Sequence, residues 1–99
     1  MSNERRLLTF SELEQFSFKH NDWTIKENVI SKEYTFDTYM NSIKFINRVA
    51  EYAENLNHHP DLEVGWCRVV ANYTTHDLGG LSTFDIHMAV LTDKAFSTK

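Results

Sequence analysis

The spacing of apolar side chains predicts a long amphipathic helix in the middle of this chain, over residues 38 to 57. Its apolar positions fall on two adjacent stripes. The first stripe consists of Tyr39, Ile43, Ile46, Ala50 and Ala53, and the second of Phe45, Val49, Tyr52 and Leu56. Together the stripes cover about half of the helix circumference, which is more than a helix needs to lie on one sheet. The surplus can pack on other helices of the chain or on another subunit, and the pattern favours neither.

Local signals predict where this helix begins and ends. Asp37 offers an N-cap at its start. Pro60, the only proline of the chain, disfavours the helical conformation of the residue before it. We therefore expect the helix to end at His58 or just before.

Two shorter helices are predicted from capping motifs. Thr9 and Glu12 have the spacing of a capping box, which would begin the first helix. Ser82 and Asp85 resemble a second box, with a shorter carboxylate, at the start of a last helix that reaches about Phe96.

Between these helices, four short segments have the composition of strands. They are residues 23–26, 29–36, 62–66 and 69–75. The dipeptide Glu27-Asn28 is suited to a hairpin turn between the first two. Cys67-Arg68 has poorer turn chemistry, so one long bent strand is an alternative for the last two. The order α-β-β-α-β-β-α predicts an α+β fold, in which three helices pack on one face of a four-stranded antiparallel sheet. The other face is expected to be solvated or used for binding.

Composition narrows the class of protein. A chain of 99 residues, 41% of them hydrophobic, suits one domain spanning residues 1–99. The net charge of −4 and the pI near 5.6 argue against a nucleic-acid partner. No apolar stretch is long enough for a membrane span or a signal peptide. Cys67, the single cysteine, excludes an intramolecular disulfide and is expected to be a half-buried strand residue. We expect a cytoplasmic protein.

Three histidines are the strongest candidates for chemistry. His58 and His59 adjoin Pro60, and neither a helix stop nor a turn requires two imidazoles. His76 ends a predicted strand just before the Gly79-Gly80 loop, a favoured position for a site residue. Because an imidazole can donate or accept a proton near neutral pH, these residues indicate acid–base chemistry.

Two carboxylates lie where they could support these imidazoles. Glu54 precedes His58 by four residues, so the two could form a hydrogen bond on one helix edge, or an ordinary exposed pair. Asp85 could be a helix cap, an orienting group for a histidine, or both. His20 and His87 are expected to have structural or surface roles.

Metal binding and nucleophilic catalysis are weaker hypotheses. Three histidines and an aspartate are adequate zinc ligands, but their spacing matches no familiar metalloenzyme motif. No serine or cysteine stands in a recognisable nucleophile motif.

Seven positions at fixed spacing carry a resemblance to a known family. They are Glu54, His58, His59, Pro60, Trp66, His76 and Asp85. Their spacing resembles the signature of the pterin-4a-carbinolamine dehydratases. The likeness includes the loop over residues 75–82 and extends upstream to Trp23, so it covers nearly the whole chain. One departure is Lys32, where the family commonly has arginine, and this leaves a structural or interface contact open.

The resemblance implies the predicted fold and a reaction. The reaction is dehydration of a 4a-hydroxytetrahydropterin, such as 4a-hydroxytetrahydrobiopterin, to the quinonoid dihydropterin, in tetrahydrobiopterin recycling. It needs no metal and no organic cofactor. His58 and His76 would be the acid and base, and Asp85 would orient or stabilise a histidine.

The remaining signature residues would hold the substrate. The resemblance implies that His59 belongs to the catalytic set and is chiefly a substrate contact. It also implies that Pro60 contacts the pterin and that Glu54 supports the site from the helix edge. Trp66 would offer an aromatic wall for the flat ring, although a core tryptophan is an equal alternative.

The family also implies protein partners. Its members form homodimers or homotetramers, so we expect a homo-oligomer. Some members are dimerisation cofactors of a homeodomain transcription factor, which would place them in the nucleus, and some relatives are assembly chaperones. A non-enzymatic interaction protein is therefore the alternative function.

Overall fold

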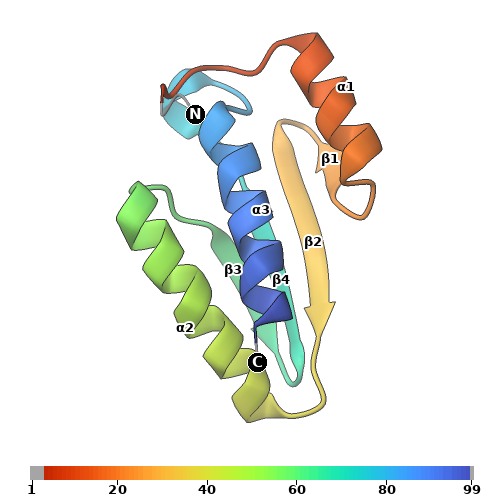
Figure 1. Ribbon diagram of the computed structural model, residues 1–99, viewed down its shortest axis with the longest axis vertical. Coiled ribbons are helices and arrows are strands. Elements are labelled where there is room, and N and C mark those ends of the chain that lie inside the picture. Colours follow the sequence, from red (N-terminus) through yellow and green to blue (C-terminus); the bar gives the residue numbers. More distant parts are fainter. Residues whose placement is uncertain (1–3, 99) are drawn as a thin grey trace.

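The computed structural model describes residues 4–98, which form three helices and four strands. In chain order these are α1 (Phe10–Lys19), β1 (Thr24–Lys26), β2 (Val29–Thr35), α2 (Tyr39–Leu56), β3 (Asp61–Gly65), β4 (Arg68–Tyr73) and α3 (Thr83–Ser97). A one-turn 3₁₀ helix, His76–Leu78, lies between β4 and α3. Figure 1 shows α2 and α3 lying roughly along the strands of the sheet, and α1 beside β1.

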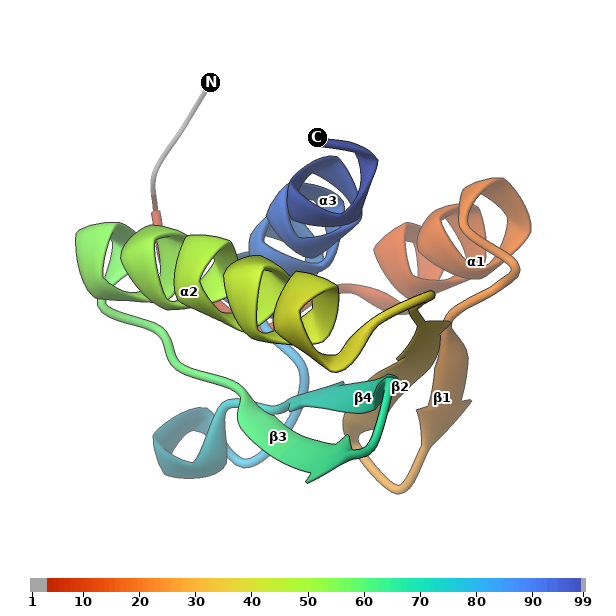
Figure 2. The same ribbon diagram turned by 90° about the horizontal axis from the view of Figure 1, so that it is seen from below.

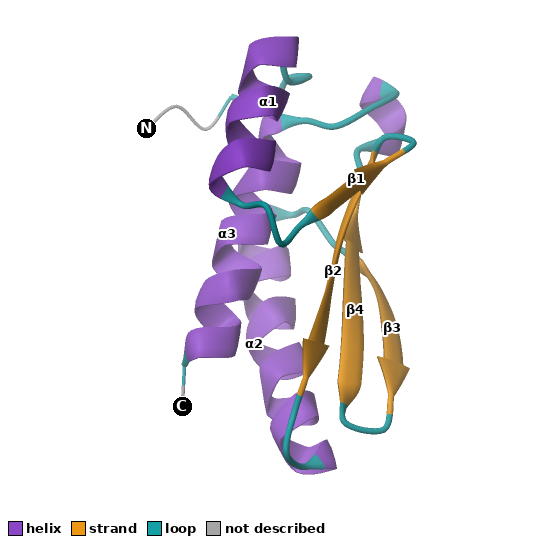
Figure 3. Cartoon of the chain, turned by 90° about the vertical axis from the view of Figure 1, so that its right-hand side faces the viewer, coloured by secondary structure: helices purple, strands orange, loops and turns teal. Residues whose placement is uncertain are grey.

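All neighbouring strands are antiparallel, in the order β1-β2-β4-β3. The three helices cover one face of the sheet, as Figure 3 shows from the side. The predicted α+β fold is therefore confirmed. No helix within residues 4–98 is long and apolar enough to span a membrane.

The two hairpins turn through residues with left-handed backbone. Glu27 and Asn28 have φ of 50° and 64°, as a two-residue turn between right-twisted strands requires. The second hairpin turns at Trp66-Cys67, one residue earlier than predicted, because Arg68 already pairs with Gly65. The alternative of one bent strand is thus wrong. Cys67 is a buried turn residue with φ of 54°, and the expected half-buried strand position is wrong too.

The capping predictions are confirmed for two helices and wrong for the third. Both capping boxes are present, at Thr9 for α1 and at Ser82 for α3. The N-cap of α2 is Thr38 and not Asp37. The hydroxyl of Thr38 accepts the backbone N–H of Asn41 at 3.1 Å, so the helix begins one residue later than an Asp37 cap would allow.

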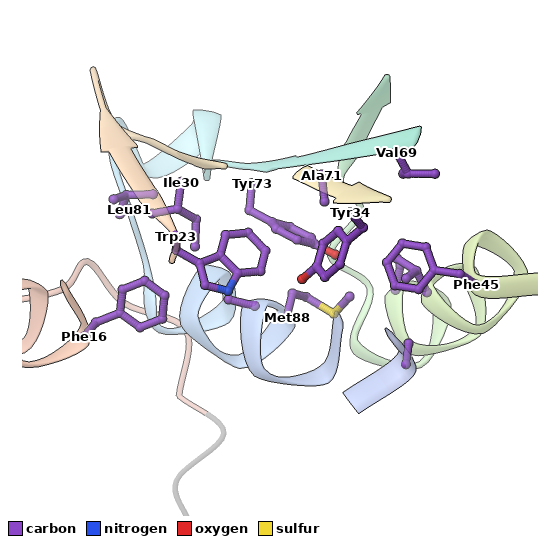
Figure 4. Packing of buried hydrophobic residues seen from close by; sticks show 14 residues of the cluster. Phe16, Trp23, Ile30, Tyr34, Phe45, Val69, Ala71, Tyr73, Leu81 and Met88 are labelled. Atoms are coloured by element: carbon purple, nitrogen blue, oxygen red, sulfur yellow. The ribbon is translucent and has the colours of Figure 1, made fainter. Parts of the chain in front are cut away.

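The core lies between the sheet and the helices, and α2 contributes mainly its second apolar stripe. Phe45 and Val49 are fully buried there, and Figure 4 shows the Phe45 ring extending from α2 toward the ring of Tyr34. The first stripe divides: Ala53 is buried and Ile46 packs against the core, whereas Tyr39 is 48% exposed. The surplus apolar arc is therefore only partly used within one chain.

Candidate active site

Two adjacent histidines after the end of α2, His58 and His59, have different environments. Asn57 takes the left-handed conformation, with φ of 54°, and ends the helix. The backbone N–H of His58 then donates to Ala53 O at 3.0 Å. After this turn the His58 ring is buried, with 8% of the residue exposed, whereas the His59 side chain is 52% exposed.

The inner histidine contacts a buried carboxylate. His58 Nε2 lies 2.6 Å from Asp85 Oδ1, and Asp85 is completely buried. The His58 ring lies between two aromatic rings, stacked on Tyr73 with centroids 6.3 Å apart and edge-on to Phe84 at 6.0 Å. This packing fixes the plane of the imidazole.

Asp85 is held by the loop that precedes its own helix. Its second oxygen, Oδ2, accepts the Thr75 hydroxyl at 2.7 Å and the backbone N–H of Ser82 at 2.8 Å. The hydroxyls of Thr75 and Ser82 are 2.7 Å apart. Asp85 is therefore both a helix cap and the partner of a histidine, as the sequence allowed. Thr75 was not predicted as a site residue, because its only signal in the sequence is its position at a strand end directly before His76.

The outer histidine pairs with Glu54. His59 Nε2 lies 2.5 Å from Glu54 Oε2. The predicted pairing of Glu54 with His58 is wrong, because the left-handed turn removes His58 from the edge of α2. Glu54, His59 and Pro60 share a pocket of about 310 Å³ between α2 and β3. The other lining residues are Val49, Ala50, Ala53 and Leu62.

His76 lies beside this constellation and faces solvent. It is exposed at the start of the 3₁₀ helix, directly after Thr75. In Figure 2 this turn and the carboxyl end of α2 lie at the same end of the molecule. The next residue, Asp77, accepts a hydrogen bond from the Arg5 guanidinium, which lowers the pKa of that carboxyl. The contact of Arg5 with Asp77 thereby joins the N-terminal segment to the 3₁₀ helix that contains His76.

A family model covers the part of the chain that contains these residues. The model for pterin 4 alpha carbinolamine dehydratase matches residues 6–95. The chain belongs to the pterin-4-alpha-carbinolamine dehydratase family.

Individual proteins of this family are similar in sequence to this chain over most of their length. A protein of Sulfurisphaera tokodaii, provisionally named pterin-4-alpha-carbinolamine dehydratase, is 34% identical over 87 residues, covering 88% of this chain and 94% of that protein. One from Saccharolobus solfataricus, with the same provisional name, is 37% identical over 94 residues, covering 93% and 95%.

Two solved structures have the same fold. The first, from Brucella melitensis, is described as a transcriptional coactivator/pterin dehydratase; it has a TM-score of 0.87 and 26% identity over 93% of this chain and all of that one. The second is a pterin dehydratase-like protein described as a RuBisCO assembly factor of the alpha-carboxysome. It has a TM-score of 0.63 and 19% identity over 78% of this chain and 89% of that one, and it shows the fold alone.

One residue of the dehydratase signature lies apart from the others. Trp66 is in the turn between β3 and β4, whereas the three histidines lie outside the other end of this hairpin, beyond the pairing of Asp61 with Asn72. Five strand residues separate the two ends, which is roughly 16 Å. Trp66 is 81% exposed, which excludes a core position. A single chain therefore does not bring Trp66 to the histidines.

The departure from the family pattern at Lys32 has a structural explanation. Lys32 Nζ contacts Asp22 Oδ2 at 2.5 Å and Asp93 Oδ1 at 2.8 Å. Burial alone would lower the pKa of Lys32, but these two hydrogen bonds outweigh it, and the pKa is raised. Asp93 also accepts from Trp23 Nε1 and the Tyr34 hydroxyl. Lys32 thus joins β2 to α3 within one chain.

The other histidines are outside this site. His20 follows α1 and packs against Phe16, with ring centroids 5.1 Å apart. His87 is half-buried on α3. Within the described part of the chain, no group of three or more His, Cys, Asp or Glu side chains could hold a metal ion.

Proposed function

We propose that this protein dehydrates a 4a-hydroxytetrahydropterin to the quinonoid dihydropterin by acid–base catalysis with His58 and His76. The observation that carries the proposal is the buried contact between His58 and Asp85, next to the exposed His76 turn. Family membership supplies the reaction class. A buried aspartate that holds one nitrogen of an imidazole is a common way to orient a general acid or base.

The reaction moves two protons and breaks one carbon–oxygen bond. An acid donates a proton to the 4a-hydroxyl, the C4a–O bond breaks, and its electron pair leaves with the water formed. A base takes the proton of the adjacent ring nitrogen, whose electron pair forms the new C=N bond. Hydroxide is a poor leaving group, so an imidazolium as the acid lowers the barrier.

The outer side chains would hold the pterin. Glu54, His59 and Pro60 line the same pocket, whose walls are otherwise apolar. The walls can accept a flat ring, and the Glu54–His59 pair offers polar groups at its edge. We assign His59 to substrate contact because its Nε2 is paired with an exposed carboxylate and not with Asp85.

A stopped-flow assay with a 4a-hydroxytetrahydropterin tests this function. We expect the wild-type chain to accelerate dehydration, and His58→Ala and His76→Ala each to reduce kcat by roughly 10²-fold or more. His20→Ala, which removes an imidazole outside the site, is the matched control and should keep its turnover. Unchanged turnover in purified His76→Ala, with the fold verified by circular dichroism, would contradict the assignment.

The same assay separates acid–base from metal chemistry. Treatment with a chelator should leave the rate unchanged, since the proposed steps use side chains alone. Inactivation that added zinc reverses would favour the metal hypothesis instead.

Protein binding is the second candidate function. The Brucella relative is described as a coactivator as well as a dehydratase. Large apolar side chains are exposed on α1, with Phe10 at 75% and Phe18 at 88%. A wild-type chain that shows no dehydration with any 4a-hydroxytetrahydropterin would favour this role over catalysis.

A further inference from the structure

The donors and acceptors of the hydrogen bonds around Asp85 can be assigned in only one way. A carboxylate accepts hydrogen bonds and donates none, and each hydroxyl has a single proton. The hydroxyl of Thr75 must therefore donate to Asp85 Oδ2. The hydroxyl of Ser82 must then donate to Thr75. The Thr75 hydroxyl and the backbone N–H of Ser82 thus both donate to one oxygen of Asp85, Oδ2.

The other oxygen of Asp85, Oδ1, contacts His58. At 2.6 Å from a carboxylate oxygen, His58 Nε2 must carry a proton. In the neutral ring the unprotonated nitrogen is then Nδ1.

The free nitrogen faces outward. Among residues 4–98, every buried side-chain nitrogen or oxygen has a hydrogen-bond partner. The contact with Asp85, through Nε2, accounts for all the hydrogen bonding of the His58 ring. His58 Nδ1 must therefore reach the small part of the residue that is exposed, which amounts to 8%.

We propose that Thr75 is a positioning residue of the dehydratase site. Its hydroxyl fixes the orientation of Asp85, and Asp85 in turn holds His58 as its Nε2–H tautomer. His58 then exchanges protons with the substrate through Nδ1. This inference rests on the proposed function and adds to it the reacting nitrogen and the residue that selects it. Thr75 acts through Asp85 and does not itself touch the substrate.

A second buried threonine provides a matched control. Thr92 is as buried as Thr75, at 0% against 1% exposed. Its hydroxyl also makes two hydrogen bonds, accepting from Tyr73 at 2.7 Å and donating to Met88 O at 2.6 Å. Neither bond involves Asp85. Thr92→Val therefore removes a comparable buried hydroxyl that makes no hydrogen bond to Asp85 or His58.

The kinetic test compares Thr75→Val, Thr75→Ser and Thr92→Val in the stopped-flow assay. We expect Thr75→Val to lower kcat roughly tenfold, the scale of one hydrogen bond to a charged group, with little change in KM. Thr75→Ser restores the hydroxyl and should recover kcat, and Thr92→Val should keep it. Full kcat in Thr75→Val overturns the proposal, as does an equal loss in Thr92→Val.

A spectroscopic test needs no activity and no variant. Nitrogen-15 NMR of the histidine side chains distinguishes Nε2–H from Nδ1–H rings, and wild-type His58 should be the Nε2–H form when neutral. An Nδ1–H ring overturns the proposal even if Thr75→Val does not fold. A wild-type chain with no dehydratase activity would instead refute the proposed function, so the two failures are distinguishable.

Discussion

At the scale of single residues, Asp85 both caps a helix and holds a histidine of the candidate site. One of its oxygens closes the capping box of α3 and the other contacts His58. An exposed capping carboxylate such as Glu12 of α1 has only the first of these tasks. The two boxes therefore allow the cap and the histidine contact to be separated by experiment.

We predict that Asp85→Asn lowers kcat by roughly 10²-fold or more, because an amide that still caps the helix turns its NH₂ group toward His58 and reverses the tautomer. Glu12→Gln is the control, since it changes the other capping box in the same way and should keep kcat. Steady-state kinetics and thermal melting of both variants are the measurements. Equal kcat values for the two variants would contradict the prediction.

The sequence predicted candidate site residues that the structure brings together, His58 and Asp85, but it did not predict the partner of Glu54. His58, Asp85 and the cap at Ser82 were found from spacing and resemblance. Pro60 predicted the end of the helix, but the left-handed Asn57 is the residue that turns His58 away from the helix edge. A tertiary contact, such as that of Thr75 with Asp85, leaves no periodic signal along the chain.

At the scale of elements, a buried tyrosine ties β4 to α3. The hydroxyl of Tyr73 donates to Thr92, and burial raises the pKa of Tyr73 to about 12. The folded state thus favours the neutral phenol more than the unfolded state, where the pKa is about 10. Its contribution to stability is complete below about pH 10 and is lost as the pH rises through about 12.

We therefore predict that the free energy of unfolding falls by roughly 2 to 3 kcal/mol between about pH 10 and 12 through this tyrosine alone. Tyr73→Phe cannot ionise, so it isolates this contribution from that of Tyr34, which both proteins retain. Urea unfolding at a series of pH values measures the difference. Parallel pH curves for wild type and Tyr73→Phe would contradict the prediction.

The contact between β2 and α3 leads to another prediction. Lys32→Met should lower the free energy of unfolding by roughly 2 kcal/mol, because Asp22 and Asp93 both lose a charged hydrogen-bond donor. Lys32→Arg, which restores the residue common in the family, should retain most of the stability. Urea denaturation measures both. Equal loss in the two variants would mean that packing matters here and charge does not.

The loss in Lys32→Met should also depend on pH. Hydrogen bonding to Lys32 lowers the pKa of Asp22. A carboxyl with a lowered pKa stabilises the fold above its ordinary value, and this stabilisation is lost as the pH falls through the folded-state value. Wild type and Lys32→Met should therefore converge in stability in acid.

Element types were predictable because their signals are local. Capping boxes predicted the starts of α1 and α3, and residue composition predicted the strands. The start of α2 and the second turn were each displaced by one residue, at Thr38 and Cys67. In both cases several neighbouring residues could satisfy the pairing or capping geometry. Composition alone therefore does not determine which residue caps α2 or which residues form the turn.

At the scale of the whole molecule, several large apolar side chains within residues 4–98 stay exposed, and two of these features bear on assembly. Trp66 lies at the hairpin tip, far from the other signature residues, and the first apolar stripe of α2 stays partly exposed at Tyr39. The width of the apolar arc was visible in the sequence, but its division between core and surface was not. Phe45 belongs to the core, so its substitution reports on folding and not on assembly.

We propose that the protein is a homo-oligomer in which the exposed stripe of α2 contributes to the interface, and Tyr39→Glu tests this. Tyr39 is the first residue of α2, whose first turn has no acidic residue, so a glutamate there favours the helix dipole and should not destabilise the monomer. It would, however, place a charge in an apolar contact between subunits. Light scattering should show an assembly for wild type and a smaller particle for Tyr39→Glu, with unchanged thermal unfolding at low concentration.

Phe45→Glu is the contrasting variant for this experiment. Phe45 is 1% exposed, so a charge there should lower the free energy of unfolding by roughly 4 kcal/mol or more. Circular dichroism would then show loss of structure, and any change in mass would follow from unfolding. A wild-type chain that is monomeric at high concentration would contradict the oligomer. An oligomer that Tyr39→Glu leaves intact would place the interface elsewhere, away from the start of α2.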